Sequence, residues 1–293
     1  NIDQFGIVTD AQWADMNRDG REDLIIVGEY SPVTIFINSE QGFDRLNNDI
    51  LDKTMGLWRA LEVVDLDDDG DLDILLGNLG KNNMLSISPE TPLVISTRDL
   101  DKNGSVDPLM FNSQQNRKGD WDMFPIQFWD NLTQQSPIFR KEFSSYRAFS
   151  KANMNYYEEK GYLKNDSLLY AKYDTSKWVE NKGSGIFEIN DLPPSLQLGP
   201  INDFLVLGKE NNRSVFMVGN DFGGPPFEGN FDAFQGSIMK KNNDGKQIVF
   251  SAQDTGFHVF GDAREINSIR MQNGKTLILV TQNQKQLLVF EKQ

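Results

Sequence analysis

The sequence predicts an all-β protein built from repeated modules, and three observations lead to this fold class. An acidic motif, D-x-[DN]-x-[DN]-G-x-x-D, occurs three times, at residues 15–23, 65–73 and 99–107. Each copy runs into a short apolar stretch that is rich in strand formers and too short for a helix. Weaker copies of the module, without the acidic residues, continue downstream. We therefore expect about five modules of short strands.

The apolar stretches beside the acidic motifs predict the first strands. Residues 24–28, 74–77 and 109–111 follow the three motifs, and residues 58–64 precede the second one. The acidic motifs should therefore lie in loops that connect consecutive strands.

Further strands are expected after the acidic motifs end. The stretches that predict them are residues 204–208, 215–220, 236–239, 247–252, 266–271, 276–280 and 286–290. The Asn273-Gly274 pair is a strong hairpin signal, and residues 243–245 should turn the chain within a second hairpin.

The repeat pattern breaks between residues 116 and 182. Within this segment, large apolar side chains recur every three to five residues, which is a helical spacing, at Phe139, Phe143, Tyr146, Phe149 and Met154. Pro137 and Gly161 are typical boundary residues for a helical segment at 136–160. We expect residues 116–182 to form a mixed, partly helical insertion within a single domain that spans residues 1–293.

Composition excludes several classes of function. The 293 residues carry 29 Lys and Arg against 43 Asp and Glu, a net charge of −14, which disfavours binding to DNA or RNA. No apolar run is long enough to span a membrane as a helix. Without cysteine and with one histidine, His258, the chain has no thiolate or multi-histidine metal site.

The acidic motifs have the composition of metal-binding loops. Positions 1, 3, 5 and 9 offer side-chain oxygens, position 7 offers a backbone carbonyl, and Gly at position 6 permits the sharp bend. The predicted ligands are Asp15, Asn17, Asp19, Arg21 and Asp23 in the first loop, Asp65, Asp67, Asp69, Asp71 and Asp73 in the second, and Asp99, Asp101, Asn103, Ser105 and Asp107 in the third.

So many hard oxygen ligands in a flexible loop favour Ca²⁺, about three ions in all, although Mg²⁺ and Mn²⁺ remain alternatives. Three Ca²⁺ would change the net charge from −14 to about −8. An EF-hand needs a Glu at position 12, where this chain has Ile26, Leu76 and Met110. The remaining alternative is that these loops are solvated turns without metal.

These loops, on strands that end in Gly-Asn or Gly-Glu, resemble the FG-GAP/VCBS repeats of integrin-α-type β-propellers. Segments such as residues 6–11, 73–78, 192–197, 230–236 and 251–262 look similar to large bacterial VCBS-repeat proteins that end in an ASPIC/UnbV-like region. The resemblance implies a β-propeller of which this chain is a C-terminal portion, with earlier blades outside it.

The same resemblance implies a location outside the cell or at the outer-membrane surface, with any lipid anchor in a region outside this chain. It implies a non-catalytic, calcium-stabilised binding or scaffold protein, either an accessory subunit of a nutrient-uptake type of outer-membrane complex or an adhesin. The expected partners are surface proteins, and glycans are an additional candidate.

Two alternatives remain from the residues themselves. A carbohydrate-binding role is suggested by aromatic side chains in and around the insertion, at Trp121, Trp129, Tyr156, Tyr157 and Trp178. A glycan-cleaving enzyme would need only two carboxylates, which leave no local signature. His258 lies in an alternating, strand-like context, and no nucleophile or phosphate-loop motif is present, so the sequence favours a protein that is not an enzyme.

Overall fold

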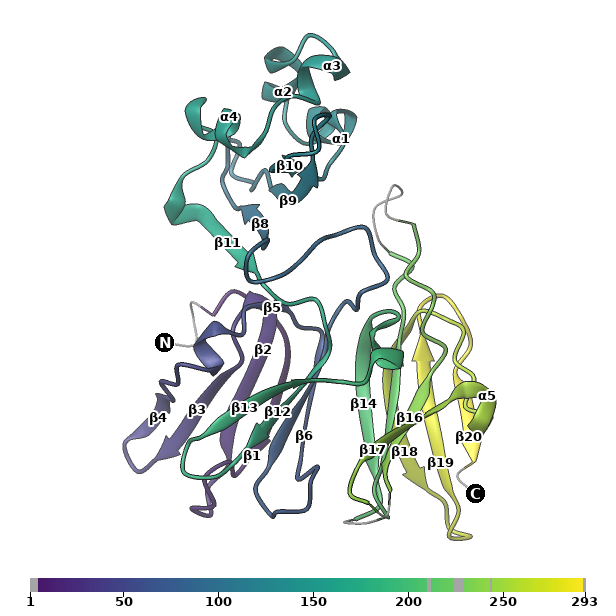
Figure 1. The fold of residues 1–293 in the computed structure, drawn as a ribbon. Helices are drawn as coiled ribbons and strands as arrows, with labels where there is room; N and C mark the ends of the chain where they lie inside the picture. The colour runs from purple at the N-terminus through teal and green to yellow at the C-terminus, as the bar shows by residue number, and fades with distance from the viewer. Residues whose placement is uncertain (1–4, 210–211, 224–228, 243, 292–293) are drawn as a thin grey trace. The chain divides into compact units, whose positions relative to one another are not determined.

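The computed structural model describes residues 5–209, 212–223, 229–242 and 244–291. The chain forms two compact units. The first unit contains the residues up to Met84 and those from Asp174 onward, and the second contains Leu85–Tyr173. The second unit therefore interrupts the first in sequence (Figure 1). This unit and the expected insertion share residues 116–173.

The described residues of the first unit form four antiparallel sheets. The first sheet has the order β1-β2-β3-β4, with β5 also paired to β2, and its strands are β1 (Ile7–Ala14), β2 (Asp23–Ser31), β3 (Thr34–Ser39), β4 (Gly42–Arg45) and β5 (Gly56–Leu57). The second has the order β13-β12-β7-β6 and contains β6 (Ala60–Val64), β7 (Asp73–Gly77), β12 (Lys177–Asn181) and β13 (Phe187–Asp191).

The other two sheets of this unit follow the chain in order. The third contains β14 (Ile201–Leu207), β15 (Ser214–Gly219), β16 (Ser237–Lys241) and β17 (Gln247–Ser251). The fourth contains β18 (Ala263–Arg270), β19 (Thr276–Gln282) and β20 (Leu288–Glu291). Short helical turns connect strands in this unit, namely η2 (Leu51–Lys53), η4 (Pro194–Gln197) and α5 (Ala252–Thr255).

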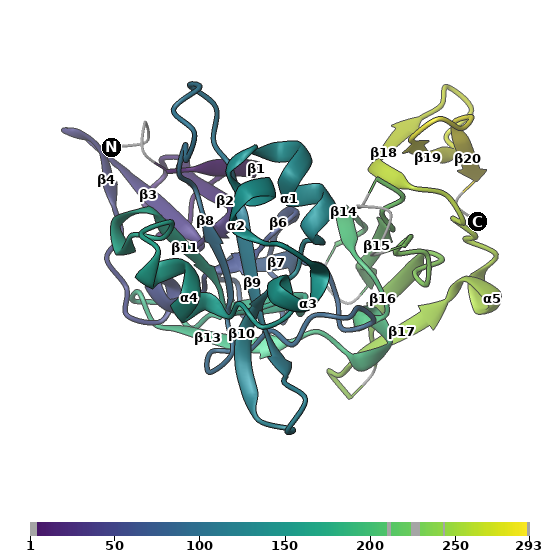
Figure 2. The same cartoon turned by 90° about the horizontal axis from the view of Figure 1, so that it is seen from above.

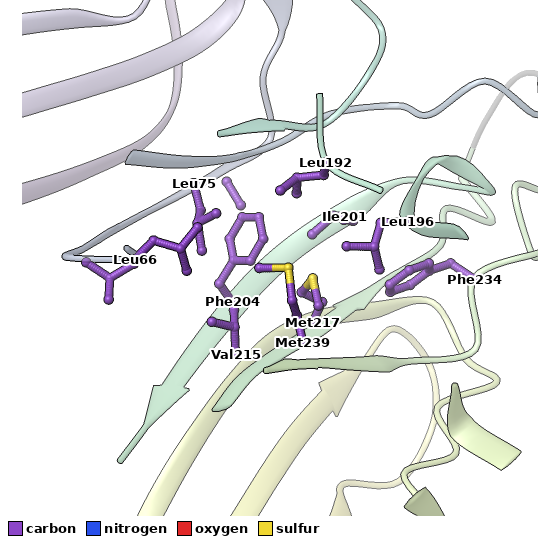
Figure 3. Packing of buried hydrophobic residues seen from close by; sticks show 12 residues of the cluster. Leu66, Leu75, Leu192, Leu196, Ile201, Phe204, Val215, Met217, Phe234 and Met239 are labelled. Carbon is purple, nitrogen blue, oxygen red and sulfur yellow. The ribbon is translucent and has the colours of Figure 1, made fainter. Parts of the chain in front are cut away.

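Apolar side chains between consecutive sheets hold them together. One buried cluster joins the second and third sheets and includes Leu75, Phe204 and Met217 (Figure 3). Another joins the third and fourth sheets through residues such as Phe216 and Ile278. Because β7 and β15 are buried along their whole length, their sequences are continuous apolar runs rather than alternating ones.

The first strands of the four sheets, β1, β6, β14 and β18, are successive neighbours. Side chains on one strand bond to the backbone of the next. Asp10 accepts a hydrogen bond from the Leu61 amide at 2.8 Å, and Asp203 accepts one from the Ile266 amide at 2.7 Å. These bonds satisfy backbone donors that have no partner within their own sheet. The result is a row of four sheets linked along their first strands.

Glycine as the last residue of β7 and of β15 is a packing requirement. A Cβ at Gly77 would lie 2.3 Å from the carbonyl oxygen of Ile201, and one at Gly219 would lie 1.7 Å from that of Pro200. Such distances are far inside van der Waals contact, so the backbones approach too closely for any side chain. This explains the Gly that ends the repeated strands in the sequence.

The second unit has its own sheet and a group of short helices (Figure 2). The sheet order is β10-β9-β8-β11, made of β8 (Leu93–Ser96), β9 (Leu109–Gln115), β10 (Trp121–Pro125) and β11 (Leu168–Ala171). The helices are α1 (Trp129–Gln135), α2 (Ile138–Glu142), α3 (Tyr146–Phe149), α4 (Met154–Glu159) and the turn η3 (Asn165–Ser167). Their shared core includes Phe111, Phe139 and Tyr157.

The helical content predicted for residues 136–160 is confirmed, but it is divided among short helices. Ser145 and Asn153 interrupt the run because each caps a new helix, accepting bonds from the Ala148 and Tyr156 amides at 3.2 Å. Pro137 precedes α2, and Gly161 follows α4 with φ +75°.

The strands predicted for the C-terminal half are confirmed, including the hairpin at Asn273-Gly274, where the Gly274 amide donates to the Met271 carbonyl. The second hairpin also forms, between β16 and β17, while Asn243 lies outside the described residues. The strand context expected for His258 is wrong: it lies in an irregular segment, where its ring stacks on Phe260 with centroids 5.3 Å apart.

Candidate metal centre

The three acidic loops connect paired antiparallel strands and share one backbone conformation. The first joins β1 to β2, the second β6 to β7, and the third β8 to β9. At position 4, Arg18, Asp68 and Lys102 have positive φ angles of 58°, 66° and 61°. The Gly residues at position 6 have φ angles of 84°, 93° and 90°. Two left-handed residues per loop produce the bend that turns the side chains inward.

The carboxylate at position 9 connects the end of each loop to its beginning through a hydrogen bond. Asp23, Asp73 and Asp107 are buried, and one oxygen of each accepts a hydrogen bond from the amide of the second loop residue, at 3.0, 2.9 and 2.8 Å. The second oxygen of Asp73 accepts from the Asn181 amide of β12 at 2.8 Å. Asp73 therefore orients the second loop and is also the first residue of β7, the strand that follows the loop.

The carboxylate at position 1 binds the bend itself. Asp15, Asp65 and Asp99 each accept a hydrogen bond from the amide of the loop Gly, at 2.8, 3.1 and 2.8 Å. The side chains at position 5, Asp19, Asp69 and Asn103, accept from the amide two residues ahead, at 2.9, 2.8 and 2.8 Å. These Asx turns explain the loop conformation in the structure.

The second loop brings three carboxylates together. Oxygens of Asp65, Asp67 and Asp73 all lie within 4.8 Å of one another. Burial raises the pKa of Asp73 to about 7, with the nearby Asp67 carboxylate adding to the effect. The Asp65 Oδ1 atom is buried without a hydrogen-bond partner among the described residues. Three carboxylates gathered this closely, with one buried oxygen unpaired, are a donor set suited to a hard cation.

The third loop forms an equivalent group in the second unit. Asp99, Asp101 and Asp107 likewise offer oxygens within 4.8 Å of one another. In both triads the position 9 residue is buried and the other two are half-buried. The predicted ligands at positions 1, 3 and 9 are therefore brought together twice, in separate units of the chain.

The first loop arranges its side chains differently. Asp19 bonds to the Arg21 guanidinium and to the Asn17 side-chain amide, whereas both oxygens of Asp15 accept backbone amides as those of Asp99 do in the third loop. Within the residues the structure describes, the carboxylates of this loop do not form a triad. The difference lies at position 3, where the first loop has the amide Asn17 in place of the carboxylates Asp67 and Asp101. Two carboxylate triads are thus present, and a third ion at this loop stays a prediction.

The remaining predicted ligands lie beside the triads. Asp71, at position 7 of the second loop, forms an ion pair with Arg18 of the first loop at 3.1 Å. Ser105, at position 7 of the third loop, is exposed and donates its amide to the Asn103 side chain. The ligand predicted at position 7 is the backbone carbonyl. The ion pair of the Asp71 side chain with Arg18 therefore does not affect that prediction.

One carboxylate at the second loop is not among the ligands predicted from the sequence. Glu180 of β12 is buried and contacts Asp67, and this contact adds to the burial that raises the Asp67 pKa. Lys182 forms an ion pair with Glu180. No local signal could identify Glu180, because it is over 100 residues from the loop and reaches it only through the pairing of β12 with β7.

A family comparison supports the resemblance over part of the chain. Residues 15–76 match the FG-GAP-like repeat family. The matched segment includes the first two acidic loops and ends in β7, before the third loop. No curated protein matches the chain. FG-GAP repeats are typical of non-catalytic binding and scaffold domains, and residues 15–76 are similar to these.

A second group of carboxylates lines a cavity of about 870 Å³ in the first unit. The cavity lies where the first strands meet, with Asp10 on β1, Glu62 on β6, Asp203 on β14 and Glu265 on β18. Burial, reinforced by Asp203 and Asp10, raises the pKa of Glu62 to about 7. Burial raises that of Asp203 to about 6. The grouping of these carboxylates could not be predicted from the sequence, because they lie in four separate strands.

The aromatic residues considered for glycan binding have different environments. Trp121 is exposed, whereas Tyr157 is fully buried in the core of the second unit. Trp129 donates its ring NH to the Phe139 carbonyl at 2.9 Å, and Tyr156 bonds to Glu142. Trp178 packs on the core of the first unit. Among these five, Trp121 alone has its ring mainly in solvent.

No described helix is long and apolar enough to cross a membrane.

Proposed function

We propose that the chain is part of a calcium-stabilised β-propeller that acts as a non-catalytic binding scaffold outside the cell. The observation that carries the proposal is the pair of carboxylate triads, held on loops with the same conformation. The row of four sheets supports the propeller, since first strands that lie side by side would surround its axis.

Calcium fits the donor set better than its competitors. Asp65, Asp67 and Asp73 would hold one ion, and Asp99, Asp101 and Asp107 a second, with backbone carbonyls and water completing the coordination. All donors are oxygen, and the loops have no rigid octahedral geometry that would select Mg²⁺. The ion would neutralise carboxylates that otherwise repel one another, so binding would stabilise the folded loops.

Calcium titration of the chelator-treated chain tests this proposal. We expect calorimetry to detect at least two bound ions, and 100 Kd of Ca²⁺ to stabilise a site by about 2.7 kcal/mol. Asp67→Asn and Asp101→Asn should each remove about one ion. Asp44→Asn, an exposed carboxylate on β4, is the matched control and should bind as the unaltered chain does. Mg²⁺ should stabilise the protein less at equal concentration.

Absence of calcium binding at millimolar concentration would reject the metal sites. Unchanged stoichiometry in both loop variants would place the ions elsewhere. Turnover of a glycan by the protein, abolished by a single acidic substitution, would reject the non-catalytic role in favour of a glycan-cleaving enzyme.

The proposed partners are surface proteins of an outer-membrane complex, or the targets of an adhesin. Support comes from the FG-GAP match and from the resemblance to bacterial VCBS-repeat proteins. Purification of the native protein from its own membranes, with calcium present throughout, followed by mass spectrometry, tests this proposal. Recovery with a transporter or surface lipoproteins would support a complex subunit, and recovery alone would favour a free binder.

A further inference from the structure

We infer that the second unit contains a binding site for an acidic oligosaccharide, in a groove between the β9–β10 hairpin and α3. We name it the hairpin groove and define it by its lining residues, which are Gln114, Gln115, Asn116, Arg117, Lys118, Asp120, Asp122, Phe124 and Pro125 of the hairpin, Phe128, and Tyr146, Arg147, Phe149, Ser150, Lys151 and Asn153. Its volume is about 1070 Å³, which is at the upper end of the range for ligand pockets. This inference rests on the second unit alone and does not require the metal sites.

Four cationic side chains line the hairpin groove. Arg117 and Lys118 belong to the hairpin, and Arg147 and Lys151 belong to α3 and the segment after it. All four are exposed, and none forms an ion pair with another described residue. Cations that the protein leaves unpaired around one groove favour an anionic ligand.

The carboxylates in the groove do not cancel this charge. Asp120 and Asp122 are the two that line it. Asp122 is already engaged, because its oxygens accept from the Asn153 side chain at 2.6 Å and the Met123 amide at 2.8 Å. The groove therefore has an excess of two positive charges around its rim.

The charge of the second unit contrasts with that of the whole chain. Residues 85–173 carry 11 Lys and Arg against 11 Asp and Glu, so the net charge of −14 belongs entirely to the first unit. Three of those eleven acids form the triad in the third loop. The second unit thus has no net negative charge of its own that would repel an acidic ligand.

Two aromatic rings provide the apolar part of the site. Phe128 and Tyr146 line the groove and are 55% and 51% exposed. Tyr146 is held in place because its hydroxyl donates to Asp130 and its ring packs edge-on against Trp129, with centroids 5.1 Å apart. A fixed, exposed ring can stack on the apolar face of a sugar with little loss of side-chain entropy.

Amide side chains favour a sugar over an acidic peptide as the ligand. Gln114, Gln115 and Asn116 line the groove beside the cations, and amides both donate and accept hydrogen bonds, as sugar hydroxyls do. Rings for the sugar faces, amides for hydroxyls and cations for carboxylates or sulfates together match an oligosaccharide of uronic acid or sulfated residues.

Calorimetric titration of the full chain, with calcium present, tests this inference. The probes are an oligogalacturonide, a chondroitin sulfate oligosaccharide, a neutral cello-oligosaccharide and poly-glutamate. We expect saturable binding of at least one acidic oligosaccharide that weakens as salt increases, and no binding of the neutral one. The double variant Arg147→Gln/Lys151→Gln should lower that affinity about tenfold or more.

Matched controls separate the groove from general charge and exposure. Arg140→Gln/Lys141→Gln removes two exposed cations on α2 that lie outside the groove, and should bind like the unaltered chain. Phe128→Ala should weaken binding, whereas Trp121→Ala, which removes a more exposed ring outside the lining, should not.

Absence of binding to both acidic oligosaccharides would overturn the inference. Equal losses in the α2 control, or preferential binding of poly-glutamate, would also overturn it, the latter in favour of an acidic polypeptide. The outcome is separate from that of the metal proposal, because Arg147→Gln/Lys151→Gln leaves both carboxylate triads intact and should bind calcium normally.

Discussion

Arg213 and Asp68 form an ion pair within the first unit. It joins the residue that precedes β15 of the third sheet to the acidic loop between β6 and β7 of the second sheet. The Arg213 Nη1 atom lies 3.0 Å from Asp68 Oδ1, and Lys241 Nζ lies 2.9 Å from the other oxygen of the same carboxylate. All three side chains are less than one-fifth exposed. Asp68 is at position 4, outside the predicted ligand set, so a loop that gathers predicted metal ligands on one side also binds the neighbouring sheet.

We expect Asp68→Asn to destabilise the first unit by about 1–3 kcal/mol, because two mostly buried cations would lose their shared carboxylate. Asparagine tolerates the positive φ of this position, so the backbone should be unaffected. Urea unfolding measures the change. Arg18→Gln breaks the more exposed pair with Asp71 and should cost at most about 0.5 kcal/mol. Equal costs for the two variants would contradict the assigned role of Asp68.

The carboxylates of the first-strand cavity predict a pH dependence of stability. Burial raises the pKa of Glu62 from 4.5 to about 7, so the folded protein holds this proton more tightly than the unfolded chain does. The resulting stabilisation is fully present below about pH 4.5 and is lost as the pH rises through about 7. Asp10, Asp203 and Glu265 face the same cavity, together with Arg59 and Arg264.

Glu62→Gln should remove that dependence. We expect the variant to be more stable than the unaltered chain at about pH 8, by on the order of 1–3 kcal/mol, and to differ little near pH 4. Thermal unfolding across this pH range measures the effect. Parallel curves for the two proteins would show that Glu62 titrates normally in the fold.

The close approach of backbones at Gly77 predicts a steric effect. We expect Gly77→Ala to destabilise the first unit by about 1–3 kcal/mol or more, because the added methyl would meet the Ile201 carbonyl at 2.3 Å. Gly223→Ala is the control, since its nearest contact would be an ordinary 3.4 Å. Chemical denaturation of both variants measures the difference, and a neutral Gly77→Ala would show that the two strands separate readily.

The two triads lie in different units, and this predicts separate responses to substitution. Asp101→Asn should lower the calcium-dependent melting of the second unit and leave the first unchanged, because its triad is made of residues 99, 101 and 107 alone. Hydrogen exchange resolved by peptide can follow each unit. Loss of protection in β6 and β7 in this variant would show that the units are coupled.

Local sequence signals predicted the strands and loops well, because both depend on short-range chemistry. The strand after each acidic loop, the Asn273-Gly274 turn and the helical character near Phe139 follow from apolar spacing and turn residues. The division of the helical segment was missed because the capping by Ser145 and Asn153 competes with the apolar spacing.

Features that depend on distant residues could not be predicted in this way. The placement of the third loop in a separate unit depends on β12 pairing with β7 across the intervening residues. Glu180 reaches Asp67 through that same pairing. The difference at the first loop was readable in principle, since Asn17 stands at position 3, where the other two loops have the carboxylates Asp67 and Asp101.

The interrupted second sheet also has a consequence for synthesis on the ribosome. Leu76 of β7 pairs with Lys177 of β12. About 100 more residues must therefore be translated before β12 is available to pair with the edge of β7. At about 5–20 residues per second, this edge waits roughly 5–20 s, during which the second unit emerges and can fold. Slow translation or early termination within residues 85–173 would leave an apolar strand edge exposed to other nascent chains.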